Sequence, residues 1–123
     1  TINNQDALLF IKRMAAVVGE LPENLHVVVR GHTSDLAPPP DSRYSDNWEL
    51  SSHRALAVAR ELIKNNISPK NITATGNAEF KPIAPNNTEE GREKNSRVDL
   101  YFFSKQSALG KESSSVLDSF SGR

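Results

Sequence analysis

The chain contains no cysteine, and this absence excludes several kinds of site at once. Disulfide bonds, cysteine-ligated metal centres and a cysteine nucleophile cannot form. The three histidines, His26, His32 and His53, fall on different predicted elements and lack the short spacing of metal ligands. We therefore expect no metal ion and no other cofactor.

An excess of one charge and long apolar runs are also lacking. The 123 residues carry 15 basic and 15 acidic side chains, so the formal net charge is zero and nucleic acid is not favoured as a partner. No stretch approaches the roughly 20 apolar residues that span a bilayer, and no signal-peptide pattern is present. The chain begins without methionine, so we expect it to be part of a longer protein.

Sequence patterns that carry catalysis are missing as well. There is no Gly-x-Ser-x-Gly elbow and no recognisable Ser-His-Asp arrangement. A phosphate-binding loop is not indicated, because Gly31 and Gly76 are isolated glycines. The sequence thus favours a binding protein over an enzyme.

What the sequence does contain is an alternation of helical and extended patterns. These patterns predict three helices, at 5–18, 46–65 and 89–95. They also predict three strands, at 25–30, 71–76 and 97–103. Asp46, followed three residues later by Glu49, is an Asp form of the capping box that starts the second helix. Strands separated by helices indicate helices packed on a sheet, and a sheet of only three strands suggests that a first strand precedes this chain.

Two segments have the composition of irregular chain. We expect a loop at 34–44, where Pro38-Pro39-Pro40 forms a stiff surface spacer or, as the alternative, a polyproline ligand. The segment 105–123 is rich in serine and is expected to be a flexible tail. The predicted organisation is therefore one domain at 1–104 followed by a tail at 105–123.

Arg54 is the most suggestive single residue of the second predicted helix. It lies one turn from both Leu50 and Val58, at the margin of the apolar face, whereas the other cations of the helix cluster on a different arc. A guanidinium in that position needs a carboxylate, several carbonyls or a ligand anion. An internal ion pair, extension of the side chain to solvent and a ligand all remain open from position alone.

A second candidate lies where the first predicted strand ends. Ser34 and Asp35 follow Thr33, and loops at strand ends are common binding positions because a rigid scaffold aims them. Asp35 would take an ammonium while Arg54 grips a carboxylate, so the pair would suit a zwitterion. The alternative for Asp35 is a turn or cap residue. We expect Trp48, at the start of the helix, to be a packing anchor rather than a stacking platform.

Three motifs follow one another along the chain: Gly31-His32-Thr33, Asn47-x-x-Leu50-Ser51-x-x-Arg54-Ala55 and Arg92-x-x-Asn95-x-Arg97-Val98. Gly76, Pro82 and Pro85-Asn86 lie between the second motif and the third. Together these residues form a signature. On these motifs the sequence resembles the OmpA-like peptidoglycan-binding domain over about 27–103. The stretch 44–51, with a tryptophan after the asparagine, more particularly resembles the B subunit of the bacterial flagellar stator, the MotB type.

The resemblance implies an α+β fold, a βαβαβ two-layer sandwich with helices packed on one face of a mixed sheet. It also implies non-catalytic binding of the peptide stem of peptidoglycan. In the family, an aspartate after Gly-His-Thr and the arginine of Leu-Ser-x-x-Arg-Ala clasp the diaminopimelate side chain. Arg54 matches that arginine.

The remaining site residues are expected to support this clasp. Thr33 and Leu50 would line the pocket, and Asn47 would fix the loop or donate to the ligand. Asn95 and Arg97 would hold the last strand and the cleft together.

Two positions depart from the family pattern. Ser34 stands where the family has its aspartate, and Asp35 follows one residue later, so we expect Asp35, with Ser34, to take the amine end. Ser96 stands where the family usually has the first of two arginines.

For a stator subunit the resemblance implies the periplasmic domain of an inner-membrane protein in a Gram-negative-type bacterium. It implies a homodimer, and an upstream membrane helix that pairs with the stator A subunit. The alternatives are an OmpA-like anchor of a lipoprotein or secretion system, and a protein-interaction module whose wall site has decayed.

Overall fold

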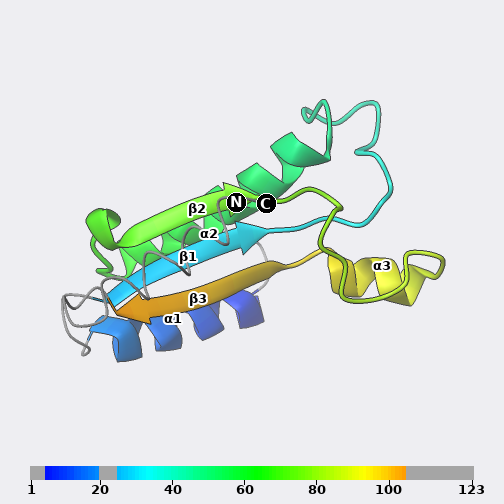
Figure 1. Ribbon diagram of the computed structural model, residues 1–123. Coiled ribbons are helices and arrows are strands. Elements are labelled where there is room, and N and C mark those ends of the chain that lie inside the picture. Colours follow the sequence, from blue (N-terminus) through cyan, green and yellow to red (C-terminus); the bar gives the residue numbers. More distant parts are fainter. Residues whose placement is uncertain (1–4, 20–24, 105–123) are drawn as a thin grey trace.

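A computed structural model describes residues 5–19 and 25–104 of the chain (Figure 1). Its helices are α1 (Gln5–Gly19), α2 (Asn47–Lys64) and α3 (Glu89–Asn95), with one 3-10 turn, η1 (Pro69–Asn71). Its strands are β1 (Leu25–Gly31), β2 (Ile72–Gly76) and β3 (Val98–Ser104). The predicted helices and strands are confirmed, and each end lies within one residue of its expected position. The expected tail at 105–123 lies outside the described residues.

The three strands form one mixed sheet in the order β2-β1-β3. β1 pairs in parallel with β2, and the connection between them contains α2. β1 pairs antiparallel with β3, so that Val29 lies opposite Leu100 on one side and Ala74 on the other. The central strand β1 therefore ends at Gly31, between β2 and β3. The polar segment that follows it begins at that end of the sheet.

Helices α1 and α2 share one face of this sheet. The buried core joins apolar residues of α1, α2, β1 and the turn that follows α2: Ile11, Ala15, Val27, Val29, Ala55, Val58, Ala59, Leu62 and Ile67. Val98 and Leu100 of β3 pack against this core, as the alternation of that strand predicts. Helix α3 lies beyond the end of the sheet instead of on its face (Figure 1). The predicted two-layer α+β sandwich is thus confirmed for the two long helices.

The start of α2 is fixed by the predicted cap, with one difference. Asp46 accepts a hydrogen bond from the Glu49 backbone N–H at 2.8 Å, as expected. The Glu49 carboxylate, however, accepts from the backbone N–H of Ser45 at 2.8 Å, one residue before the cap.

Among the helices of residues 5–19 and 25–104, none combines the length and apolar character that crossing a membrane requires.

Candidate functional site

Glycines at the ends of β1 and β2 bring the first half of α2 close to the sheet. A Cβ on Gly31 would lie 2.0 Å from the carbonyl oxygen of Ser51, and one on Gly76 would lie 2.6 Å from the backbone nitrogen of Ser52. Such distances leave room only for glycine. This close approach places Arg54, one turn further along α2, beside the end of the central strand.

Hydrogen bonds hold the chain as it leaves β1. His32 N–H donates to the Arg97 carbonyl at 2.9 Å, and Thr33 N–H donates to the Ala78 carbonyl at 3.0 Å. The fully buried Ser51 hydroxyl accepts from Ala78 N–H at 3.0 Å. The Gly-His-Thr segment is therefore bonded directly to Arg97 and Ala78, and Ala78 is bonded in turn to α2.

Arg54 donates from Nη1 to the carbonyl oxygen of His32 at 2.9 Å. No carboxylate pairs with its guanidinium within the described chain. Burial lowers the pKa of Arg54, and the neighbouring Tyr44 acts in the opposite direction. Of the three partners that the sequence left open, the structure supplies a single carbonyl, and most donors of the guanidinium are left for a ligand.

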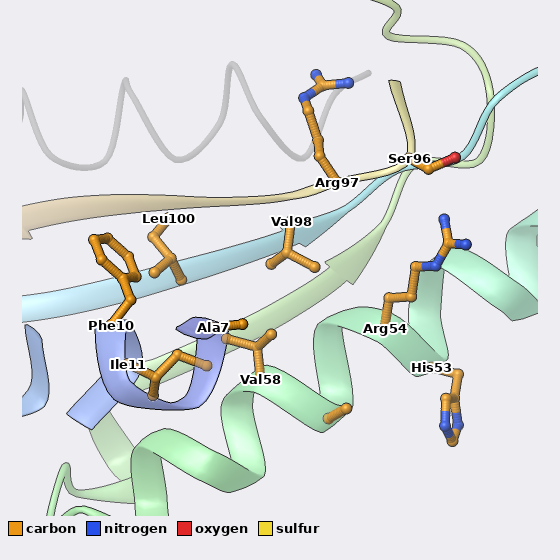
Figure 2. Close-up of a pocket in the computed structure, with 11 residues that line it drawn as sticks. Ala7, Phe10, Ile11, His53, Arg54, Val58, Ser96, Arg97, Val98 and Leu100 are labelled. Carbon is orange, nitrogen blue, oxygen red and sulfur yellow. The ribbon is translucent and has the colours of Figure 1, made fainter. Parts of the chain in front are cut away.

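The Arg54 guanidinium lies at one end of a pocket of about 500 Å³ between α1, α2 and β3 (Figure 2). The other lining residues that define this Arg54 pocket are mainly apolar: Ala7, Ile11, Val58, Val98 and Leu100. Arg97 also lines the pocket at its rim, but its guanidinium turns away from Arg54 in Figure 2. The pocket therefore has the Arg54 cation at one end and mainly apolar walls, with His53 and Ser96 also among its lining residues.

Arg97 and Asn95 hold the segment that runs back to β3. The Arg97 guanidinium donates to both oxygens of Asp99 at 3.2 Å and to the Lys81 carbonyl at 3.0 Å. The fully buried Asn95 accepts from the N–H groups of Ile83 and Ala84 at 2.8 and 3.0 Å. These contacts are the kind that the expected supporting role requires.

The other predicted site residues are not among the residues that line the Arg54 pocket. Thr33 and Ser34 are buried, and the Thr33 hydroxyl donates to the Ser34 carbonyl at 2.8 Å. Leu50 is half-buried and does not line the Arg54 pocket. Asp35 is exposed and lines a second hollow, together with Asn47. The structure thus separates Asp35 from Arg54 instead of joining them in one pocket.

Asn47 fixes the loop after β1. Its Nδ2 donates to the carbonyls of Ser34 at 3.4 Å and Leu36 at 3.0 Å. Both N–H groups of the amide are used in this way, so of the two roles expected for Asn47 the structure shows the loop-fixing one.

A buried histidine next to the site was not singled out by the sequence. His32 is 2 % exposed, and its Nε2 lies 3.2 Å from Oδ2 of Asp99. Burial and the nearby Arg97 lower the pKa of His32 to about 4, although Asp99 acts to raise it. His32 is therefore neutral at pH 7. Its place between Gly31 and Thr33 in the motif was the signal that could have drawn attention to it.

Metal binding has no support in the part of the chain that the structure describes. Residues 5–19 and 25–104 contain no group of three or more His, Asp or Glu side chains that could hold an ion.

The chain is similar to a known motility protein in both sequence and structure. Motility protein B of Helicobacter pylori is 36% identical over 108 residues, which cover 88% of this chain and 42% of that protein. The crystal structure of the C-terminal domain of Helicobacter pylori MotB superposes with a TM-score of 0.80 at 36% identity, covering 96% of this chain and 88% of that domain. The chain thus spans about two fifths of the curated relative.

A second solved structure has a different cellular role. The cell wall anchor of the T6SS from Pseudomonas aeruginosa superposes with a TM-score of 0.68 at 33% identity, covering 81% of this chain and 65% of that one. The sequence profile of the OmpA family matches residues 3–96, which include every residue of the Gly-His-Thr and Leu-Ser-x-x-Arg-Ala motifs. The chain therefore belongs to the OmpA family, and within it is similar to motility protein B.

Proposed function

We propose that this domain binds the peptide stem of peptidoglycan without catalysis and anchors a flagellar stator complex to the cell wall. The observation that carries the proposal is the Arg54 guanidinium, which is partly buried at the end of an apolar pocket and bonded to one carbonyl only. A partly desolvated cation with free donors favours an anionic partner. The carboxylate of a diaminopimelate side chain has that chemistry.

The pocket suits the rest of such a ligand. Its apolar walls would contact the aliphatic part of the side chain while Arg54 takes the carboxylate in bidentate fashion. Asp35, with Ser34 beside it in the chain, would take the amine end; Asp35 lines the neighbouring hollow. A ligand that reaches both would have to extend from the Arg54 pocket across the segment after β1.

The wider assignment rests on the similarity to motility protein B. By that similarity the domain is periplasmic, forms a homodimer, and is joined through an upstream membrane helix to the stator A subunit. The alternative is an anchor of another envelope complex, which the likeness to the T6SS cell wall anchor favours. A protein-interaction module with a decayed wall site is the remaining alternative, because Ser34 replaces the family aspartate.

Co-sedimentation with purified sacculi tests the binding proposal. We expect Arg54→Ala to weaken binding about 10- to 100-fold, because a charge-assisted hydrogen bond at a partly buried site contributes roughly 1.5–3 kcal/mol. Arg54→Lys should restore only part of the affinity, because an ammonium cannot bond both carboxylate oxygens in one plane.

Arg60→Ala is the matched control, since Arg60 is an exposed arginine on the same helix. It should sediment like the wild type. If the folded wild-type domain stays in the supernatant, or if Arg54→Ala and Arg60→Ala behave alike, the proposed function is wrong.

A further inference from the structure

A hollow of about 360 Å³ adjoins the Arg54 pocket, because His53 lines both of them. We call it the Arg43 hollow and define it by Arg43, Tyr44, Glu49, Ser52, His53 and Leu56. We propose that it binds a second carboxylate of the peptide whose first carboxylate Arg54 takes. This inference rests on the proposed function and adds a requirement to it, namely that the preferred peptide carries two acidic groups.

The Arg43 guanidinium is held in place by two aromatic neighbours. Its Nη2 donates to Nε2 of His53 at 2.8 Å and to the hydroxyl of Tyr44 at 3.2 Å. Its central carbon lies 5.3 Å from the centre of the Tyr44 ring, and the two rings lie 5.3 Å apart between centroids. A side chain that is already ordered loses less conformational entropy when a ligand binds to it.

The backbone around Arg43 is also fixed. The N–H of Ser42 donates to the carbonyl of Pro39 at 3.0 Å, which closes a turn just before Arg43. Two residues after Arg43, the N–H and the hydroxyl of Ser45 donate to the Glu49 carboxylate at 2.8 and 3.2 Å. The end of the proline-containing loop is therefore joined to the first turn of α2, and this contact sets the position of Arg43.

The charge of Arg43 is not compensated. Within the described chain Arg43 has no salt-bridge partner, and its Nε and Nη1 donate to no other group. Glu49 is the one carboxylate that lines the hollow, and its Oε1 is already used by Ser45. A guanidinium with free donors suits a carboxylate, which can take two of them in one plane.

The electrostatic potential at the wall between the hollow and the pocket favours an anion. Burial lowers the pKa of His53, the nearby Arg43 and Arg60 lower it further, and no carboxylate of the described chain acts to raise it. Arg54 adds a third positive charge in the pocket that His53 also lines. Three guanidiniums against the single carboxylate of Glu49 leave this surface positive.

Tyr44 and His53 are neighbours of both arginines that would hold the peptide. Tyr44 lies beneath Arg43 and also opposes the effect of burial on the pKa of Arg54. His53 bonds to Arg43 and lines the Arg54 pocket. The two guanidiniums therefore belong to one continuous surface, which a short peptide can cover.

Calorimetric titration with two synthetic peptides tests the inference. The acid peptide is L-alanyl-γ-D-glutamyl-meso-diaminopimelic acid, and the amide peptide is the same molecule with the α-carboxylate of its glutamyl unit converted to an amide. We expect the wild type to bind the acid peptide roughly three- to fivefold more tightly, which is the upper part of the range for an exposed ion pair. Equal affinities for the two peptides, or no binding of either, would overturn the inference.

Substitutions locate the preference. Arg43→Gln should lower the affinity for the acid peptide to that for the amide peptide and leave the latter unchanged. Arg13→Gln is the matched control, because Arg13 is an exposed arginine of α1 that lines neither the hollow nor the Arg54 pocket. It removes the same charge and should keep the preference. If Arg43→Gln weakens both peptides equally, or if Arg13→Gln also abolishes the preference, the effect is not local and the inference is wrong.

Sacculi separate this inference from the proposed function. If the wild type sediments with sacculi and binds both peptides equally, the inference fails and the function stands. If the wild type prefers the acid peptide but stays in the supernatant with sacculi, the anchoring function is wrong and the two-carboxylate site stands. If neither sacculi nor either peptide is bound, both are wrong.

Discussion

Acid should destabilise this domain through His32, the buried histidine at the end of β1. Three charged groups act on its neutral ring: Arg97, which directly precedes β3, Asp99 of β3 and Arg30 of β1. Burial and the two arginines disfavour a proton on the ring, and Asp99 compensates only in part. The pKa therefore falls from 6.5 to about 4 on folding.

The sign and size of the effect follow from that difference. Between pH 6.5 and 4 the unfolded chain binds a proton at His32 and the folded chain does not, so stability is present above pH 6.5 and is lost as the pH falls. At about 1.4 kcal/mol for each pKa unit, the free energy of unfolding should fall by about 2 kcal/mol at pH 5 and by about 3 at pH 4. Below pH 4 this loss levels off.

Urea unfolding at a series of pH values measures this loss. His32→Gln removes the titrating group, so the variant should start less stable at pH 7 and lose less stability than the wild type on acidification. His53→Gln is the comparison variant: His53 is half-buried on α2, and burial and the nearby Arg43 also lower its pKa, so the pH profile should change in the same direction but less than in His32→Gln.

Two outcomes would refute the reasoning. One is a parallel pH dependence of the wild type and His32→Gln. The other is an NMR titration of the folded protein in which the His32 ring protonates near pH 6.5.

Two substitutions test the contacts that shape the site, with urea unfolding as the measurement. Gly31→Ala should lower the free energy of unfolding by ~1–3 kcal/mol, because its Cβ would lie 2.0 Å from the Ser51 carbonyl oxygen. Asn95→Ala should cost ~2–4 kcal/mol, because the N–H groups of Ile83 and Ala84 lose their acceptor. An unchanged stability of either variant would contradict the contact assigned to it.

The course of the chain could be predicted because it depends on local patterns. Periodic apolar residues mark α1 and α2, and the β-branched run of β1 marks the central strand. The cap at Asp46 was predictable for the same reason, since its hydrogen bond joins residues three apart. The position of α3 beyond the sheet could not be predicted, because a short charged helix carries no apolar face that assigns it to a layer.

The candidate site was predictable only in part. The motif identified Arg54, and its spacing from Leu50 and Val58 placed it at the margin of the apolar face of α2. The sequence also suggested that Asp35 and Arg54 meet, whereas the structure places them in separate pockets. Residue spacing cannot reveal that Asp35 and Arg54 line different pockets, because the loop from 34 to 46 has no periodic pattern from which its path could be predicted.

The sequence by itself determined the elements, their order and the family, because these follow from local periodicity and from short motifs. Only the tertiary structure decided which groups lack partners, namely the free donors of Arg54 and the unpaired oxygen of Asn47, and that the ring of His32 is buried and neutral. Whether a polar group has a partner depends on residues far apart in the chain. Contacts of that kind exist only once the glycines at the strand ends have let α2 close onto the sheet.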